Sequence, residues 1–276
     1  MSEQPPAPTT DAPVDALADA RGSVAALRAS HDRLRTLVEP LDATQVEAQA
    51  YPTEWSIAQV LSHLGSGAEI FGSFVEAGVR GEEPPGPDAF PPVWEAWNAK
   101  SPPAQVADAL VADLAFVERF DAMDDDQLAS LRLAVFGMDL DAAALVRMRL
   151  SEHALHTWDV AVALDPEATV APDAVDRLVD LVTQFAARAG KPLDRPLRVA
   201  LIVSAPERRF VLDVGDAVTV TESDGAGDDQ GLPQLRLPAE ALLRLVYGRL
   251  DPAHTPESVE AHGVDLDELR RVFPGV

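Results

Sequence analysis

Two residues that can ligate a metal or transfer protons stand one turn apart in the segment 141–164. Glu152 and His156 are four positions apart, so on a helix they share one face. A helical wheel places both in the sector occupied by the apolar residues Leu145, Met148 and Leu155. We therefore expect a carboxylate and an imidazole to point together toward a protein core.

Further histidines lie near this pair or on a second helix. His63 falls beside the apolar stripe of the segment after Ser56, on the flank shared by Ile70 and Phe74, so it can reach the same interior. His153 is about 100° around the helix from Glu152 and is expected to face outward or a groove edge, which makes it the weaker candidate. We expect no other histidine-rich cluster at core-facing positions.

The spacing of these residues allows two interpretations. An isolated buried carboxylate or imidazole is unfavourable by several kcal/mol unless it is paired or bound to a metal. A hydrogen-bonded Glu–His pair satisfies that requirement, and so does a metal ion held by His63, Glu152 and His156. Residue spacing alone leaves both open.

Other common reaction signatures are absent. The chain has no GxSxG, GxxxxGK[ST] or HExxH motif, and Gly225, Gly227 and Gly231 lie in acidic text that does not open a helix. It also has no cysteine, which excludes disulfides, cysteine-ligated metals and a cysteine nucleophile. Any thiol chemistry would therefore need a thiol from outside the chain.

The composition narrows the class of partner. Lys and Arg number 22 against 46 Asp and Glu, a net charge of −24 that repels nucleic acids and anionic membranes. The composition is otherwise typical of a globular protein, with 47% hydrophobic residues and no long apolar run. We expect a cytoplasmic protein, monomeric or homodimeric, with a Pro-rich disordered tail over residues 1–12 and a small-molecule partner.

Long segments of helical period position the candidate residues. We expect helices over about 14–38, from 57 to Gly81, over 103–123, over 141–164 and over 174–189. Ser56 is a good N-cap for the second of them. This pattern predicts an α-helical bundle domain over residues 13–190.

The period changes after the Gly- and Pro-bearing segment 189–196. Short β-branched runs at 197–205, 208–215 and 217–223 predict an antiparallel sheet, and residues 232–250 read as a strand followed by a helix. A last short helix is expected over 266–273. The second domain, residues 197–276, is therefore α+β.

Two stretches carry a family resemblance. EWSIAQVLSHLGSGAEIF, and RMRLSEHALHTWDVAVAL some ninety residues later, resemble the paired signature of the mycothiol-dependent maleylpyruvate isomerase family within the DinB-like bundles. The resemblance covers residues 21–189, and LLRLVYGRLDP resembles part of the family's sterol-carrier-like α+β domain. It implies a four-helix bundle followed by that small domain.

The same resemblance assigns roles to residues. It implies a divalent metal, most consistent with zinc, bound by His63, Glu152 and His156, and mycothiol as thiol cosubstrate. Arg249 matches an arginine that reaches the active site, where it would bind an anionic group of substrate or cofactor; the alternative is a surface arginine. Asp159, one turn beyond His156, would orient a ligand imidazole or act on a proton, unless it is only a helix-terminal charge.

Two kinds of function follow from this reading. In the first, the protein is an enzyme in which a metal-activated thiolate attacks an electrophilic small molecule, as an isomerase or an S-transferase. In the second, it is a non-catalytic module that binds a metal or an apolar ligand. An open-coordinated metal site favours the first, and an apolar tunnel in the second domain favours the other.

Overall fold

The computed structural model describes residues 12–225, 227 and 229–275, and divides into two units at Ala163 and Leu164. The expected tail over residues 1–12 lies almost entirely outside the described residues. Within them, no helix has both the length and the apolar character needed to cross a bilayer.

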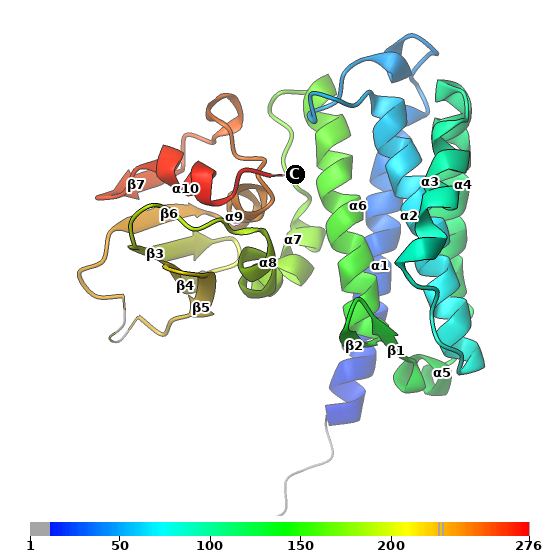
Figure 1. Ribbon diagram of the computed structural model, residues 1–276, viewed down its shortest axis with the longest axis horizontal. Helices are drawn as coiled ribbons and strands as arrows, with labels where there is room; N and C mark the ends of the chain where they lie inside the picture. The colour runs from blue at the N-terminus through cyan, green and yellow to red at the C-terminus, as the bar shows by residue number, and fades with distance from the viewer. Residues whose placement is uncertain (1–11, 226, 228, 276) are drawn as a thin grey trace, which may run out of the picture. The chain divides into compact units, whose positions relative to one another are not determined.

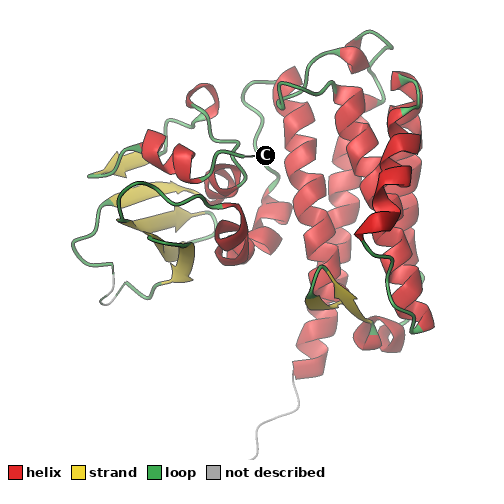
Figure 2. Ribbon diagram, in the orientation of Figure 1, coloured by secondary structure: helices red, strands yellow, loops and turns green. Residues whose placement is uncertain are grey.

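The first unit is built from helices. Figure 1 shows the long helices α1, α2, α4 and α6 side by side, and Figure 2 shows that a two-stranded sheet is the only strand structure drawn among them. The helices are α1 (Ala12–Val38), α2 (Ile57–Arg80), α3 (Phe90–Asn98), α4 (Pro102–Asp121), α5 (Asp125–Ser130) and α6 (Ala142–Leu164). The hairpin joins β1 (Arg132–Val135) to β2 (Met138–Asp141).

The local sequence explains where α2 begins and ends. The Ser56 side chain accepts a hydrogen bond from the Gln59 amide, and the Gln59 side chain accepts one from the Ser56 amide, which is a capping box. Gly81 ends the helix in the left-handed conformation, with φ of 66°. Both boundaries agree with the sequence prediction.

Two glycines within α2 allow close packing by larger side chains. A Cβ at Gly65 would lie 2.3 Å from the Trp97 ring, and one at Gly67 would lie 2.8 Å from Nη1 of Arg149. Trp97 and Arg149 are both buried. The Trp97 ring and the Arg149 guanidinium group therefore occupy the space beside α2 at the two glycines.

The second unit is α+β. Its five-stranded sheet has the order β5-β4-β3-β6-β7, with β3 and β6 parallel and the other neighbours antiparallel. The strands are β3 (Leu197–Ser204), β4 (Arg208–Val214), β5 (Val218–Glu222), β6 (Gln234–Pro238) and β7 (Glu260–His262). The helices are α7 (Pro172–Leu178), α8 (Val182–Ala189), α9 (Ala239–Val246) and α10 (Leu266–Val272). Single 3-10 turns occupy Gln45–Glu47, Pro87–Ala89, Val179–Leu181 and Pro252–His254.

The expected fold class, a helical bundle followed by an α+β domain, is confirmed. The expected boundary at 190–197 is later than the division observed at residue 164. The segment 174–189 is also two helices, α7 and α8, and not one. The physical reason for the shift is packing, because α8 contacts β5 and α9, and α7 contacts α9. These helices bury their apolar faces within the sheet unit.

Candidate metal centre

The three residues expected to ligate a metal lie together in the first unit. His63 comes from α2, and Glu152 and His156 come from α6. One ligand-type atom from each lies within 4.8 Å of those of the other two. The two helices thus face each other as the sequence analysis required.

Individual distances fit a metal site. Nε2 of His63 is 3.4 Å from Oε2 of Glu152, and Nε2 of His156 is 3.7 Å from the same oxygen. Ligand atoms around a tetrahedral zinc at the usual bond lengths are about 3.3–3.5 Å apart. The residues present therefore fit a divalent ion with little movement of their side chains.

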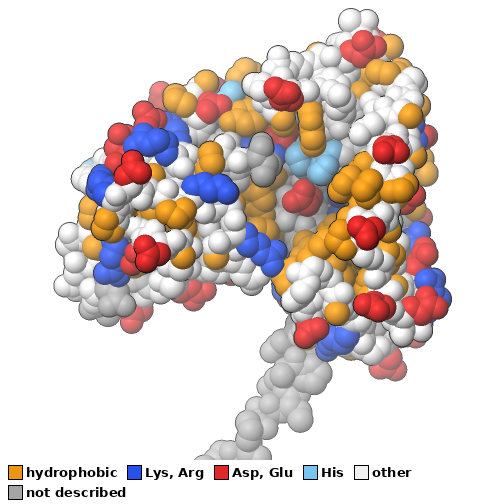
Figure 3. Space-filling model, in the orientation of Figure 1, with side chains coloured by type: hydrophobic (Ala, Val, Ile, Leu, Met, Phe, Trp, Pro, Cys, Tyr) orange, Lys and Arg blue, Asp and Glu red, His pale blue; other side chains and the backbone are white. Residues whose placement is uncertain are grey.

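One side of this cluster is open. The side chains of His63 and Glu152 are 37% and 40% exposed, whereas that of His156 is 11% exposed. Figure 3 shows histidine atoms at the surface over the helical unit, beside acidic and hydrophobic side chains. Three protein ligands with an open side form the arrangement of a catalytic, rather than a structural, metal centre.

Asp159 contacts the His156 imidazole at Nδ1. Its Oδ2 is 2.8 Å from Nδ1 of His156, and the Asp159 side chain is fully buried. A carboxylate at Nδ1 fixes the ring orientation and leaves Nε2 for the cluster. This contact supports the orienting role expected for Asp159 over that of a helix-terminal charge.

The loop before α2 places an aromatic ring, that of Trp55, against both histidines. The Trp55 ring is stacked on that of His156 with centroids 6.0 Å apart, and lies 5.3 Å from that of His63. The Tyr51 amide donates to the Asp159 carbonyl at 3.1 Å, so the same loop is attached to α6 beside His156. The site is built from two helices and one loop.

Glu152 is ionised over the whole neutral range. Burial by itself raises the pKa of its carboxyl group, but the hydrogen bond with His63 and the charges of His156, His63 and Arg149 outweigh burial and lower the pKa to about 2. A carboxylate in this state is ready to accept a cation.

Arg249 lies in the second unit. It follows Gly248, whose φ of 70° ends the helical segment as expected, and it is 8% exposed. Its Nη1 donates to the Tyr247 carbonyl at 2.9 Å. The interior position agrees with the expectation, and its role in binding an anion stays a prediction.

The prediction for His153 is wrong. The side chain is 1% exposed and joins His31 of α1 and Asp113 of α4 in a second cluster of ligand-type groups, which the sequence analysis did not expect. The reason is that His153 faces α1 and α4, where it contacts Ser30 and Asp113, so a rotation of about 100° leads to another buried face and not to solvent.

A sequence signal for this second cluster existed. His31 follows Val24 and Leu27 and precedes Leu34 and Val38 in a three–four repeat of core positions. Asp113 likewise interrupts the stripe of Val106, Ala109, Phe116 and Phe120 on α4. A polar residue inside an apolar stripe predicts a buried polar group.

Comparisons with known proteins agree with this geometry. Residues 27–161 match the family model described as the mycothiol maleylpyruvate isomerase N-terminal domain. No curated protein matches the chain at a significant level. The matched range includes all three candidate ligands and Asp159.

Solved structures extend the likeness over both units. The crystal structure of a mycothiol-dependent maleylpyruvate isomerase superposes with a TM-score of 0.66 at 14% identity, covering 89% of this chain and 95% of that one. A mutant of that isomerase with one histidine replaced by alanine gives 0.65 at 13% identity, with the same coverage. At these identities the likeness concerns the fold. The likeness to the mycothiol maleylpyruvate isomerase N-terminal domain therefore covers residues 27–161, and the likeness of fold covers both units.

Proposed function

We propose that this protein is a metal-dependent enzyme that uses mycothiol, or a similar low-molecular-weight thiol, to attack an electrophilic small molecule. The observation that carries the proposal is the cluster of His63, Glu152 and His156, whose ligand-type atoms lie within 4.8 Å of one another with one side open. The match of residues 27–161 to the mycothiol maleylpyruvate isomerase N-terminal domain supports the choice of thiol.

The chemistry of the donors favours a zinc-type ion. Two imidazoles and one carboxylate suit zinc and its neighbours better than magnesium or calcium, which prefer oxygen ligands. When bound, such an ion lowers the pKa of a coordinating thiol and so supplies a nucleophile at neutral pH. The chain has no cysteine, so the thiol must be a cosubstrate.

The chain's own residues prepare the site. Glu152 supplies the one ionised carboxylate among the three ligands, and Asp159 directs Nε2 of His156 toward the cluster. Trp55 packs against both imidazoles, so we expect thiol and substrate to approach the cluster from another side.

The carrier alternative finds little support in the second unit. A cavity of about 690 Å³ lies against its sheet and is lined by three arginines, three glutamates and several serines, among them Arg209, Arg236 and Glu222. An apolar ligand requires an apolar lining, whereas this cavity is charged.

The test separates metal dependence from thiol dependence. Zinc content and turnover of maleylpyruvate are measured with and without mycothiol for the parent protein, for His63→Ala, and for His262→Ala as a control. His262 is an exposed histidine of the other unit. We expect loss of both zinc at this centre and turnover in His63→Ala, and neither loss in the control.

Two results would overturn the proposal. Full turnover in thiol-free buffer would remove the thiol from the reaction, and a His63→Ala variant that keeps its activity would remove the metal centre. Product analysis then assigns the reaction class, because an isomerase releases the thiol and an S-transferase retains it in the product.

A further inference from the structure

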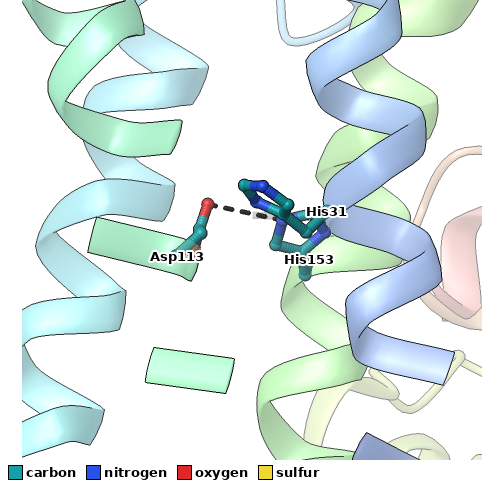
Figure 4. A group of neighbouring side chains, drawn as sticks. All are labelled: His31, Asp113 and His153. Atoms are coloured by element: carbon teal, nitrogen blue, oxygen red, sulfur yellow. Dashed lines mark ion pairs between the residues drawn. The ribbon is translucent and has the colours of Figure 1, made fainter. Parts of the chain in front are cut away.

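A second cluster of ligand-type side chains is buried inside the helical bundle, apart from the centre described above. His31 projects from α1, Asp113 from α4 and His153 from α6, and Figure 4 shows the three side chains meeting between these helices. One ligand-type atom of each lies within 4.8 Å of the others. All three residues are at most 2% exposed.

Each of the three side chains has one buried atom without a hydrogen-bond partner among the described residues. These atoms are Nδ1 of His31, Oδ2 of Asp113 and Nε2 of His153, and each is shielded from solvent. Buried polar atoms are almost always paired, so three unpaired atoms on three neighbouring side chains are unexpected. An occupant at the point where these side chains meet would satisfy all three at once.

Hydrogen bonds on the far sides direct two of these side chains. Nδ1 of His153 is 2.9 Å from Oγ of Ser30 and 3.2 Å from Oγ1 of Thr157, which leaves Nε2 for the shared point. Arg149 donates to Oδ1 of Asp113, which leaves Oδ2. Supporting contacts of this kind are what orient ligands around a metal.

The distance between Asp113 and His153 has the length that a shared metal ion requires. Oδ2 of Asp113 is 3.3 Å from Nε2 of His153, although no hydrogen bond joins them. Two ligand atoms of a tetrahedral zinc are about 3.3–3.5 Å apart. The same geometry appears at the His63 centre, where the corresponding distance is 3.4 Å.

We propose that His31, Asp113 and His153 bind a second divalent metal ion, of the zinc class, which links α1, α4 and α6 within the bundle. Because the site is buried on all sides, its role is structural, unlike that of the open centre at His63. This inference does not depend on the proposed function.

The protonation states of two ligands are those that binding needs. Burial lowers the pKa of His31, more than the nearby carboxylate of Asp113 raises it, so the imidazole is neutral. Burial alone would raise the pKa of Asp113, but the neighbouring Arg149 and His153 lower it, so the carboxyl group is ionised. Neutral imidazole and ionised carboxylate are the ligating forms.

Charge balance limits which ion fits. Arg149 already offsets the negative charge of Asp113, so an ion would depend mainly on the two imidazoles. Nitrogen donors favour zinc, cobalt, nickel or copper, and a hard ion such as magnesium would gain little. A groove of about 470 Å³ beside α1 and α4 has His31 in its lining.

The experiment uses a full-length variant that lacks the first centre. His63→Ala/His156→Ala is loaded with Zn²⁺, dialysed and analysed for metal, and a parallel sample is loaded with Co²⁺ for visible absorption. We expect one ion per chain and a tetrahedral Co²⁺ spectrum. Adding His31→Gln should lower the content to zero, whereas adding His262→Ala should leave one ion.

A zinc content of zero in His63→Ala/His156→Ala would overturn the proposal, and so would a content of one that persists after His31→Gln. Circular dichroism first checks that each variant is folded. If His31→Gln does not fold, the thermal midpoint of His63→Ala/His156→Ala is measured against Zn²⁺ concentration. A midpoint that rises with zinc supports the site, and a constant midpoint refutes it.

Discussion

Asp159→Asn should weaken metal binding at the His63 centre while leaving the ligands in place. The substitution keeps the size of the side chain but removes the charge 2.8 Å from Nδ1 of His156. Loss of a supporting partner of a metal ligand typically lowers affinity by about 10- to 100-fold. That range corresponds to about 1.4–2.8 kcal/mol of binding free energy. Full burial of Asp159 places the expected effect toward the upper end, since water cannot replace the lost charge.

The assay is competition for Zn²⁺ between protein and a chromophoric chelator at pH 7.5, in a His31→Gln background so that one centre is read. Asp251→Asn is the matched control, because Asp251 contacts Nδ1 of His254 at 2.9 Å with the same three-residue spacing, but in the second unit. We expect the control to bind zinc as the parent does. A zinc affinity of Asp159→Asn within twofold of the control would refute the orienting role.

Three further outcomes are expected. If the planar guanidinium of Arg249 binds an anion, Arg249→Lys should lower kcat/KM, with a loss of transition-state binding on the order of 1–3 kcal/mol. An unchanged kcat/KM in Arg249→Ala, at unchanged stability, would exclude that role. In chelator-treated protein, stability should fall as pH drops through about 6.5, because unfolded His31 binds a proton that the folded side chain resists. His31→Gln should reduce that slope in urea unfolding at pH 7 and pH 5, and an unchanged slope would contradict the assignment. Gly65→Ala should lower the free energy of unfolding by about 1–3 kcal/mol, because its Cβ would clash with the Trp97 ring. Gly86→Ala is the control, since no atom lies within 4 Å of its added Cβ. Equal melting temperatures for the two variants would contradict this packing argument.

The helices of the bundle could be predicted because local signals coincide with packing there. The Ser56 cap and the Gly81 stop mark both ends of α2, and its apolar stripe gives the face that is buried. The sequence analysis did not predict helix α3 or the β1–β2 hairpin, because these elements are short and their sequences are rich in proline or lack a clear hydrophobic periodicity. The boundary between the units was misplaced, since α7 and α8 carry helical period but pack on the sheet.

The grouping of the open centre could be predicted, whereas for the buried cluster the sequence indicates only that His31 and Asp113 are buried, and the reason is geometric. Glu152 and His156 share one face of a single helix, so spacing brings them together. His31, Asp113 and His153 come from three helices, and their meeting depends on rotations and heights that only packing determines. A prediction from a helical wheel also assumes that the helix has an exposed face, whereas most residues of α6 are buried.

The arrangement of α6 has a consequence for protein engineering. Glu152, His156 and Asp159 bring two candidate ligands, and the carboxylate that contacts one of them, within eight consecutive residues. Only His63 must come from elsewhere, 89 positions away from Glu152. The segment is therefore a portable half-site: grafted onto an exposed face of another antiparallel helix pair, it needs a single added histidine on the facing helix to complete a three-ligand centre.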